Sequence, residues 1–359
     1  MSIKSINGQL PKVTICVPVR NGARTIQRTL DSLLNQDYPN YEIIVSDNCS
    51  DDGTEKIVSQ YASKGVKYFF NPVLEKFGES NWNHILTLAE GPFIALYHAD
   101  DIYTSTMVRR QVEFLRKYDN VTAVFTMSQR INENDKPIRM GNFKLPKEYK
   151  GKELFSFREL FNAVLKYGTI TIVPTMMTRK SVLDKAGNFN WPRFCSASDI
   201  DLYLRMSQLG PIGIIDEPLH KYRISAQQGT NVINKSRKHL AHEFWVMDAW
   251  LSNKENYQVI SQPNRKIYEM RRAIDLIGCA KNLLVEGNNN QAKEMIIKEL
   301  KLTYFITAFK RPSCFKLLFY TIIMLLSIRF GVGVLSARCI TKAQQMKLKL
   351  RHKPLKRVV

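Results

Sequence analysis

Closely spaced cysteines are missing from this chain of 359 residues. Its six cysteines stand far apart, and no two of them form a Cys-x-x-Cys pair. This spacing argues against a structural zinc site, which needs thiolate or imidazole ligands at short intervals. The chain also does not open with a basic stretch followed by an apolar one, the pattern of a secretory signal. We therefore expect reduced thiols and a cytoplasmic location.

Acidic residues are missing from the last part of the chain, Lys301 to Val359. This segment holds eight lysines and five arginines, so it carries +13 of the net charge of +21, and the first 300 residues carry +8. So basic a composition is also typical of nucleic-acid binding proteins. However, no known nucleic-acid motif occurs, and the basic residues surround an apolar run instead of alternating with aromatic residues. We predict no nucleic-acid partner.

The apolar run in this basic segment extends over 21 residues from Leu317 to Ala337 and is interrupted by Arg329. Its length matches the ~20 residues that a membrane span needs, but an arginine inside a span costs ~2.5–3.5 kcal/mol. Three arrangements are open: helices in or re-entering the membrane plane, a single span, or a buried pair of soluble helices. Because lysine and arginine flank the run, we expect peripheral or monotopic attachment to an anionic membrane surface, on the inner face of the cell membrane.

Strand-like apolar runs alternate with helix-like segments through the first hundred residues. The segment after the first run repeats its apolar residues with helical spacing, as at Ile26, Leu30 and Leu33. Such alternation predicts an α/β fold, a Rossmann-like mixed and mostly parallel sheet flanked by helices. A further strand is predicted at 212–216. The predicted strands of the first part are 13–19, 41–46, 66–70 and 93–97.

Two adjacent carboxylates, Asp100 and Asp101, directly follow the strand-like run at 93–97. Neighbouring acids at the end of a buried strand repel each other and lose water, which is costly unless a cation or several donors lie close by. The pair therefore indicates a metal site. The alternative is that the two acids cap the helix predicted for 103–118.

Turns that follow parallel strands meet at one edge of the sheet, where ligands bind in such folds. Asn21, Asp47 and Asp100 all lie in turns of this kind, so we expect them to converge although they are distant in the sequence. Two roles are open for Asp47. It can accept a hydrogen bond from a base or a ribose, or it can form an Asx-turn with its own backbone.

Three segments in this order and spacing resemble the family 2 glycosyltransferases of the GT-A type. They are Val17–Gly22, Glu42–Thr54 and Ala99–Tyr103, and the resemblance covers roughly residues 12–225. It implies a transferase that moves a sugar from a nucleotide-sugar donor to a hydroxyl group with inversion at the anomeric carbon. The Gln-x-x-Arg-Trp motif of processive polysaccharide synthases is absent, so we expect transfer of one sugar at a time.

The resemblance also implies roles for single residues. Pro18 and Asn21 fall in the motif that borders the nucleotide, and Asp47 falls where the acid of the family contacts the base. Asp100 and Asp101 fall on the acids that hold Mg²⁺ or Mn²⁺ against the diphosphate of the donor. Hard carboxylate oxygens suit either ion, which neutralises the charge of the departing diphosphate.

His98 departs from the family pattern, because many members carry an aspartate at this position. A neutral imidazole is softer than a carboxylate and favours Mn²⁺ over Mg²⁺ if it binds the ion directly. The alternative is that His98 only donates a hydrogen bond to a phosphate or to a neighbouring acid.

A proton acceptor for the attacking hydroxyl is expected near the start of a predicted helix. Asp199 takes the position of the catalytic base in the family motif, although Ser198 replaces the usual glutamate before it. The alternative is that Asp199 only stabilises the first turn of the helix. Asp201 is expected to be a structural partner of Arg205.

Arg223 precedes a polar loop, Ser225 to Asn231, which resembles the segment that ends the catalytic domain in the family. Two roles are open for Arg223: contact with the donor phosphates, or a structural ion pair. The domain boundaries that we predict are a catalytic domain at 1–231, a helical extension at 232–310 and a basic, membrane-associating tail at 311–359. Within the catalytic domain, 12–125 binds the nucleotide and 126–231 binds the acceptor.

These observations together predict a metal-dependent glycosyltransferase. Its acceptor is expected to be a glycan or a lipid-linked molecule, in cell-surface polysaccharide or glycolipid synthesis. Two alternatives belong to other classes. A nucleotidyltransferase would need a glycine-rich loop with a basic residue, of which Arg20–Gly22 is a poor version. A non-catalytic module that binds nucleotides or glycans would follow if His98 and Ser198 mark a decayed site.

Overall fold

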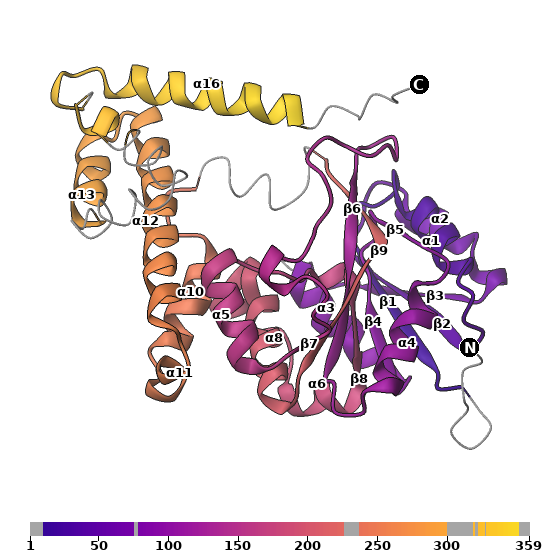
Figure 1. Ribbon diagram of the computed structural model, residues 1–359. Helices are drawn as coiled ribbons and strands as arrows, with labels where there is room; N and C mark the ends of the chain where they lie inside the picture. The colour runs from indigo at the N-terminus through magenta and orange to yellow at the C-terminus, as the bar shows by residue number, and fades with distance from the viewer. Residues whose placement is uncertain are drawn as a thin grey trace, which may run out of the picture. The chain divides into compact units, whose positions relative to one another are not determined.

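Figure 1 shows the computed structural model, which describes residues 10–74, 78–225, 237–299, 319, 322–326 and 328–351. Proximity of Cα atoms divides the chain into two compact units, Met1–Ile224 and Ser225–Val359. The described residues of the first unit form an α/β domain, and those of the second form helices. We call these two parts the sheet unit and the helical unit.

The described residues of the sheet unit build a nine-stranded sheet. Its strands lie in the order β3-β2-β1-β4-β8-β6-β9-β5, and β7 pairs with β9 outside this path. The strands are β1 (Val13–Val19), β2 (Tyr41–Asn48), β3 (Val66–Asn71), β4 (Phe93–Leu96), β5 (Ile102–Tyr103), β6 (Ala123–Ile131), β7 (Leu154–Phe155), β8 (Met176–Arg179) and β9 (Ile212–Arg223).

The sheet is mixed, as the alternating pattern of the sequence predicted. The strands β3, β2, β1 and β4 are parallel to one another, and β6 is parallel to β9. The pairs β4–β8, β6–β8, β5–β9 and β7–β9 are antiparallel. The parallel part places the ends of β1, β2 and β4 at one edge, which is where the candidate site lies.

Helices and short 3₁₀ turns connect the strands of the sheet unit and cover the sheet. Every residue of β1 is buried, because helices pack on both of its faces. The helices are α1 (Ile26–Leu34), α2 (Thr54–Ser59), α3 (Gly78–Leu88), α4 (Met107–Lys117), α5 (Phe157–Tyr167), α6 (Lys180–Ala186), α7 (Trp191–Phe194) and α8 (Ser198–Leu209), with 3₁₀ turns at Ala62–Lys64, Lys147–Tyr149, Val173–Thr175 and Cys195–Ala197.

A core on one face of the sheet joins β1, β2 and β4 to the apolar sides of α1 and α4. Ile26, Leu30 and Leu33 of α1 pack there against strand residues such as Ile15 and Val45. Their spacing of four and three residues is what the sequence predicted for one side of a helix. The core fixes the strands whose ends carry the candidate site.

Two elements differ from what the sequence predicted. Helix α4 begins at Met107 and not at residue 103, because Ile102 and Tyr103 form β5 and pair with β9. Strand β9 continues to Arg223 instead of ending at residue 216. It pairs with β6 throughout, and the register shifts near Met127, where Pro218 enters the pairing. The extension of β9 brings additional side chains to the site.

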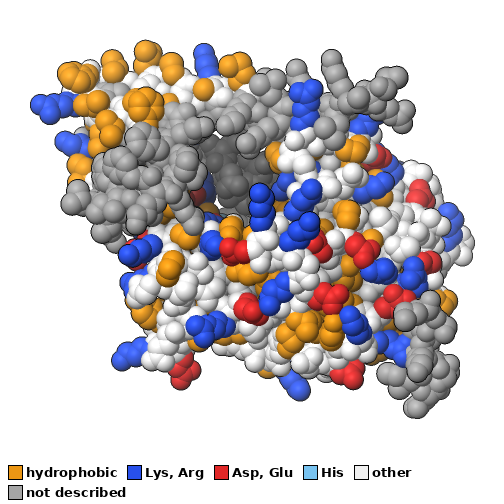
Figure 2. Space-filling model, in the orientation of Figure 1, with side chains coloured by type: hydrophobic (Ala, Val, Ile, Leu, Met, Phe, Trp, Pro, Cys, Tyr) orange, Lys and Arg blue, Asp and Glu red, His pale blue; other side chains and the backbone are white. Residues whose placement is uncertain are grey.

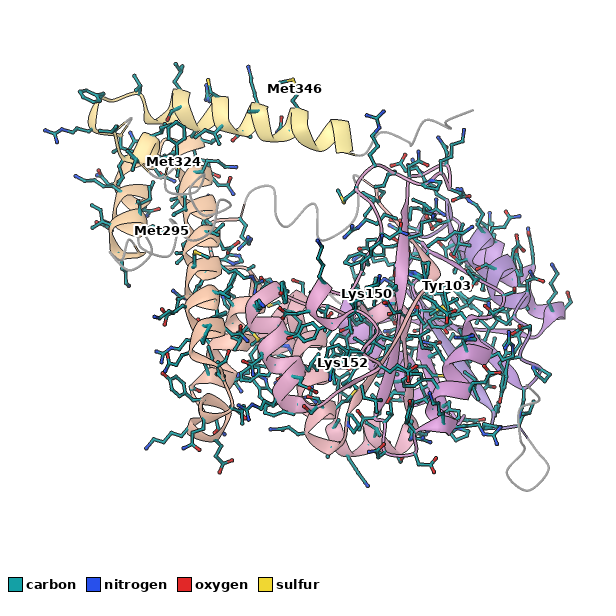
Figure 3. The ribbon with its side chains drawn as sticks, viewed as in Figure 1. Tyr103, Lys150, Lys152, Met295, Met324 and Met346 are labelled. Carbon is teal, nitrogen blue, oxygen red and sulfur yellow. The ribbon has the colours of Figure 1, made fainter. Side chains whose placement is uncertain are left out.

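The helical unit comprises antiparallel and crossing helices around a small core. Its described helices are α10 (His242–Leu251), α11 (Lys254–Gln258), α12 (Gln262–Val285), α13 (Asn289–Glu299) and α16 (Gly333–Arg351). Figure 3 labels Met295 and Met324, both of which contribute to this core, and Met346 on the outer side of α16. Gly287 and Asn288 lie in the break between α12 and α13.

The segment from Leu317 to Ala337 is only partly described. Residues 317, 318, 320, 321 and 327 of it lie outside the described residues, as do residues 226–231 of the predicted polar loop. No helix among the described residues is both long enough and apolar enough to cross a membrane. Residues 322–326 are helical, and α16 begins at Gly333.

Candidate active site

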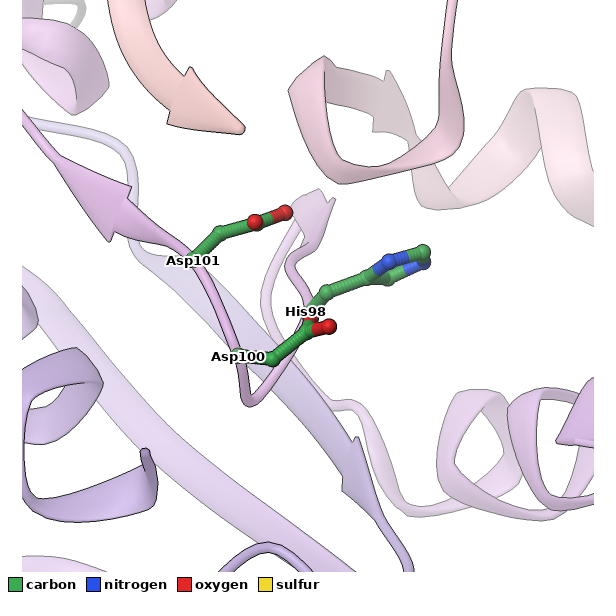
Figure 4. Close-up of side chains that lie close together, drawn as sticks. All are labelled: His98, Asp100 and Asp101. Atoms are coloured by element: carbon green, nitrogen blue, oxygen red, sulfur yellow. The ribbon is translucent and has the colours of Figure 1, made fainter. Parts of the chain in front are cut away.

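The three predicted metal ligands lie together in the turn between β4 and β5. His98, Asp100 and Asp101 each present one ligand atom, and these atoms lie within 4.8 Å of one another. Figure 4 shows the three side chains projecting from this turn. The turn follows β4, a fully buried strand between β1 and β8, so its position is set by the centre of the sheet.

Side chains from three other parts of the sheet unit hold the backbone of this turn. A donor lies within hydrogen-bond distance of every carbonyl oxygen from residue 98 to residue 101, and the single proton of the Thr29 hydroxyl serves two of them. Thr29 Oγ1 lies 2.9 Å from the Ala99 oxygen and 2.8 Å from the Asp101 oxygen. The Tyr103 hydroxyl bonds both the N–H and the carbonyl of His98, and Arg223 Nε donates to the Asp100 oxygen at 2.7 Å. The turn is therefore rigidly positioned before any ligand binds.

Asp101 is the most deeply buried member of the cluster. Its Oδ1 accepts the backbone N–H of Arg223 at 2.8 Å, and its Oδ2 lies 2.9 Å from His220 Nε2 without the alignment of a hydrogen bond. The other ring nitrogen of His220 lies 2.8 Å from Ser128 Oγ. Burial raises the pKa of Asp101 to about 8, although Arg223 works against this, and burial lowers the pKa of His220 to about 3.

Asp100 and His98 are partly exposed beside Asp101. Burial and the charge of Asp101 raise the pKa of Asp100 to about 6. Burial, opposed by Asp100, lowers the pKa of His98 to about 4, so its imidazole is neutral near pH 7. His98 Nε2 is buried and has no hydrogen-bond partner among the described residues. A neutral imidazole nitrogen of this kind is suited to bind a metal ion.

The donor set fits a divalent cation. Two carboxylates are held close together in surroundings that make their charges costly, and a bound cation removes that cost because it favours the ionised form. The buried His98 Nε2 provides a third ligand atom without a competing partner among the described residues. Carboxylate oxygens with one imidazole suit Mn²⁺ and also accept Mg²⁺.

The loops after β1 and β2 are joined to each other by hydrogen bonds. Asn21 has a positive φ of 52°, which turns the first loop toward the second. A Cβ atom on Gly22 would lie 2.5 Å from Val19 Cγ2, so the turn leaves no room for a side chain there. The connecting bonds are Asn21 N to Ser50 Oγ (2.8 Å), Gly22 N to Thr54 Oγ1 (2.9 Å), Ala23 N to Asp52 Oδ2 (2.9 Å) and Asp51 N to Asn21 Oδ1 (3.0 Å).

Pro18 and Asp47 lie in the strands that lead into these loops. Pro18 is buried within β1 and is in register with Ser46. Asp47 is 1% exposed, and its carboxylate accepts the N–H of Ser50 at 2.9 Å and the hydroxyl of Tyr68 at 3.0 Å. The bond to Ser50 closes a local turn, which is one of the two roles that the sequence left open for Asp47. Contact of Asp47 with a nucleotide base stays a prediction.

Arg223 ends β9 and is 2% exposed. Besides the bond to Asp100, its guanidinium donates to the carbonyl oxygens of Asn132 and Glu133 at 3.1 and 3.2 Å, and it pairs with Asp135 at 2.5 Å. These contacts hold parts of the protein together, which corresponds to the structural ion pair, one of the two roles predicted for Arg223. Contact of Arg223 with a phosphate stays a prediction.

Asp199 lies in the first turn of α8, next to the 3₁₀ turn Cys195–Ala197. Its Oδ1 is 2.8 Å from the N–H of Ile200, and it is not a member of the described metal cluster. Asp201 pairs with Arg205 at 2.9 Å, which confirms the structural role expected for it. The role of Asp199 as a base stays a prediction.

Sequence reasoning missed three residues that contact the turn or its carboxylates, Thr29, Tyr103 and His220, and it missed Ser128, which contacts His220. It also passed over Trp82, whose ring lies 5.4 Å from the His98 ring and packs edge-on against Phe189 at 5.1 Å. A signal existed for His220, because it stands three residues before Arg223. Figure 3 labels Tyr103, which lies among the strands.

Comparison with known proteins points to the family that the sequence motifs resemble. Residues 14–187 match the family described as Glycosyl transferase family 2. The glycosyltransferase EpsE of Bacillus subtilis is 35% identical over 119 residues, which are 32% of this chain and 42% of EpsE, so the chain spans less than half of that relative. The glucosyltransferase WfgD of Escherichia coli is 25% identical over 243 residues, which are 67% of this chain and 87% of WfgD.

A solved structure shares the fold. The mannosyltransferase PcManGT of Pyrobaculum calidifontis superposes with a TM-score of 0.51 at 17% identity, over 92% of this chain and 87% of PcManGT. At this level of identity the likeness shows a GT-A-like fold and no more. The matched family, the glycosyltransferase relatives and the mixed sheet agree with one another: residues 14–187 of this chain match glycosyl transferase family 2.

Proposed function

We propose that this glycosyltransferase moves a sugar from a nucleotide-sugar donor to a hydroxyl group of a glycan or a lipid-linked acceptor, with the help of Mn²⁺ or Mg²⁺ and with inversion. One sugar is transferred at a time, and the product serves cell-surface polysaccharide or glycolipid synthesis. The observation that carries the proposal is the cluster of His98, Asp100 and Asp101 at the sheet edge next to the loops after β1 and β2.

The names of two similar proteins support this choice of substrates. WfgD is named as a transferase that uses UDP-glucose and a diphosphoundecaprenol-linked GlcNAc. PcManGT was solved in complex with GDP-mannose and Mn²⁺. A lipid-linked acceptor for this chain is consistent with the basic apolar tail from residue 311, whose attachment to the inner face of the cell membrane is part of the proposal.

Each predicted site residue has a part in this proposal. His98, Asp100 and Asp101 hold the cation, which when bound neutralises the negative charge that develops on the diphosphate leaving group. Asn21 and Pro18 border the nucleotide. Asp47 contacts its base, and Arg223 contacts its phosphates. The rigid turn around Asp100 is what lets its carboxylate keep one orientation while the donor binds.

Asp199 accepts the proton of the attacking hydroxyl in this proposal. A positioned carboxylate contributes roughly 10²–10⁴-fold to the rate of such a step. Inversion requires the acceptor to attack from the side opposite to the diphosphate, so the base belongs to a different element from the metal ligands. Asp199 meets this condition because it lies on α8, whereas the metal ligands follow β4.

The domain boundaries predicted from the sequence remain part of the proposal. The catalytic domain reaches residue 231, the helical extension covers 232–310 and the tail covers 311–359. In this scheme the segment 12–125 binds the nucleotide, and 126–231, which contains Asp199, binds the acceptor.

The test is an assay of donor turnover with a panel of UDP-sugars and GDP-sugars, in Mn²⁺ and in EDTA. We expect release of nucleoside diphosphate that depends on the cation. Release of pyrophosphate would indicate a nucleotidyltransferase, and no release with any donor would indicate a binding module.

Replacing Asp199 by asparagine tests the assignment of the base. We expect Asp199→Asn to lower transfer by about 10²–10⁴-fold and to leave donor and Mn²⁺ binding, measured by calorimetry, nearly unchanged. The matched control is Asp201→Asn, two residues away, which breaks the pair with Arg205 and is expected to lower stability but not the rate of the folded enzyme. Full turnover by Asp199→Asn would remove this residue from the mechanism.

A further inference from the structure

One side of the C-terminal segment of the helical unit is apolar and exposed. Phe319, Ile322, Leu326, Phe330, Val332 and Leu335 are between 44% and 72% exposed. We call these six residues the apolar edge. Figure 2 shows hydrophobic side chains gathered with basic ones in the region of α16. Contiguous apolar surface of this kind is uncommon on soluble monomers and marks a surface that binds something.

The apolar edge is the outer side of helices whose inner side is already packed. Met324 and Ala337 are buried in the core of the helical unit, together with Leu284 of α12 and Ile296 of α13. Ile322 and Leu326 are one helical turn apart and face away from that core, because Met324 lies between them and is 2% exposed. The core is therefore complete without the apolar edge.

Basic residues accompany the apolar edge, and acidic residues do not. Arg329 directly precedes Phe330, and Arg338 and Lys342 follow on α16; all three are exposed. The sequence contains no aspartate or glutamate from Lys301 to Val359. A protein partner with an apolar patch would not require this charge pattern. A layer of anionic lipid head groups above an acyl region matches both features at once.

We propose that the apolar edge inserts into the surface of an anionic lipid bilayer, with Phe330, Val332 and Leu335 at the level of the upper acyl chains. Arg329, Arg338 and Lys342 contact the lipid phosphates beside them. In this proposal the contact is made in the plane of the membrane surface, and no helix among the described residues is long and apolar enough to span a membrane. The inference deepens the proposed function, on which it rests, because a lipid-linked acceptor lies in the same surface.

The first experiment measures binding of the full-length protein to vesicles by flotation. The vesicles contain equal parts of phosphatidylglycerol and phosphatidylcholine, or phosphatidylcholine alone. We expect the double variant Phe330→Ser, Leu335→Ser to bind the anionic vesicles about tenfold or more weakly than the parent, since two large apolar side chains no longer enter the bilayer. The matched control is Ile297→Ser on α13, which is 56% exposed, lies outside the apolar edge and is expected to bind like the parent.

The second experiment tests the basic residues. We expect Arg329→Gln, Arg338→Gln to weaken binding to the anionic vesicles about tenfold, and a rise in salt to weaken the parent in the same direction. Phosphatidylcholine vesicles are expected to bind the parent poorly. Circular dichroism and thermal unfolding confirm that every variant is folded. Parent-like vesicle binding by the folded Phe330→Ser, Leu335→Ser variant would overturn the proposal.

Two further outcomes would also overturn it. One is equal binding to neutral and anionic vesicles. The other is a dimer in sedimentation velocity that disappears in the Phe330→Ser, Leu335→Ser variant, because the apolar edge would then bind a second copy of the chain.

Donor hydrolysis in solution separates this proposal from the proposed function. The edge variants are expected to keep it, whereas Asp199→Asn is expected to lose it and still bind vesicles.

Discussion

Thr29 shows how a single hydroxyl group serves the candidate site. It lies on α1, 70 positions before Ala99 and 72 positions before Asp101, and it reaches the carbonyl oxygens of both. Neither oxygen is able to reach water easily, since Thr29 and Asp101 are fully buried. The Thr29 hydroxyl therefore holds the backbone of the turn in place through these two carbonyl oxygens.

Replacing Thr29 by valine keeps the shape of the side chain and removes this donor. We expect Thr29→Val to lower the free energy of unfolding by ~1–3 kcal/mol, the cost of leaving a buried acceptor unsatisfied, and to weaken Mn²⁺ binding. Urea denaturation and a metal titration measure the two effects. Thr87→Val is the control, because the Thr87 hydroxyl is exposed and bonds only within its own helix. Equal stability of both variants would contradict this account of the turn.

Arg223 is the residue whose two predicted roles lead to different results. If its contacts are mainly structural, Arg223→Gln lowers the free energy of unfolding by ~1–3 kcal/mol, since it leaves the carbonyl oxygens of Asp100, Asn132 and Glu133 without this donor. Arg28→Gln is the control: Arg28 also pairs with Asp135, at 3.0 Å, but is 42% exposed, so less than ~1 kcal/mol is expected. A raised KM for the donor with unchanged stability in urea would instead assign Arg223 to the phosphates.

At the scale of the elements, Glu42 of β2 ties together the three parallel strands that begin the sheet. Its carboxylate accepts the hydroxyl of Thr14 in β1 at 2.8 Å and pairs with Lys67 in β3 and with Lys12, both at 2.9 Å. Burial opposes ionisation, but the hydrogen bonds from Lys67, Lys12 and Thr14 outweigh it and lower the pKa of Glu42. The ionised form is thus favoured by folding.

This shift predicts a pH dependence of stability. A carboxyl group whose pKa is lower in the folded state stabilises the protein above its unfolded pKa, and the contribution is lost as the pH falls through the folded pKa. We expect Glu42→Gln to cost about 1–2 kcal/mol at pH 7, and the difference from the parent to shrink as the pH falls below about 4.3 and to vanish once the pH is below the lowered pKa of the folded state. Urea denaturation across this range measures it, with the exposed Glu133→Gln as control. A difference that persists at low pH would show that packing, not charge, is responsible.

At the scale of the whole molecule, binding of the correct donor is expected to stabilise the protein. A ligand at a hundred times its Kd adds about 2.7 kcal/mol to the free energy of unfolding. Thermal unfolding with a panel of nucleotide-sugars and Mn²⁺ should therefore single out the donor. Asp199→Asn is expected to keep the shift, and Asp100→Asn to lose the part that depends on Mn²⁺. A panel without any shift would argue against nucleotide-sugar binding.

Much of the fold was predictable from local patterns. The continuous apolar runs of β1, β2 and β4 predict strands that are buried on both faces, and the spacing of Ile26, Leu30 and Leu33 predicts the buried side of α1. These features depend on a few consecutive residues. The pair Asp100 and Asp101 was recognised for the same reason, because it directly follows such a strand.

The surroundings of that pair were decided by the tertiary structure alone. Asp101 meets His220, and His220 meets Ser128, only because β9 lies between β6 and β5 in the sheet. No pattern of neighbouring residues encodes the order of strands that are a hundred positions apart. By itself the sequence determined the positions of β1, β2 and β4, the acids that lie at or after their ends, and the charge of the tail. Only folding decided which acid is buried, which arginine holds it and which apolar side chains stay exposed, since each of these depends on packing between distant segments.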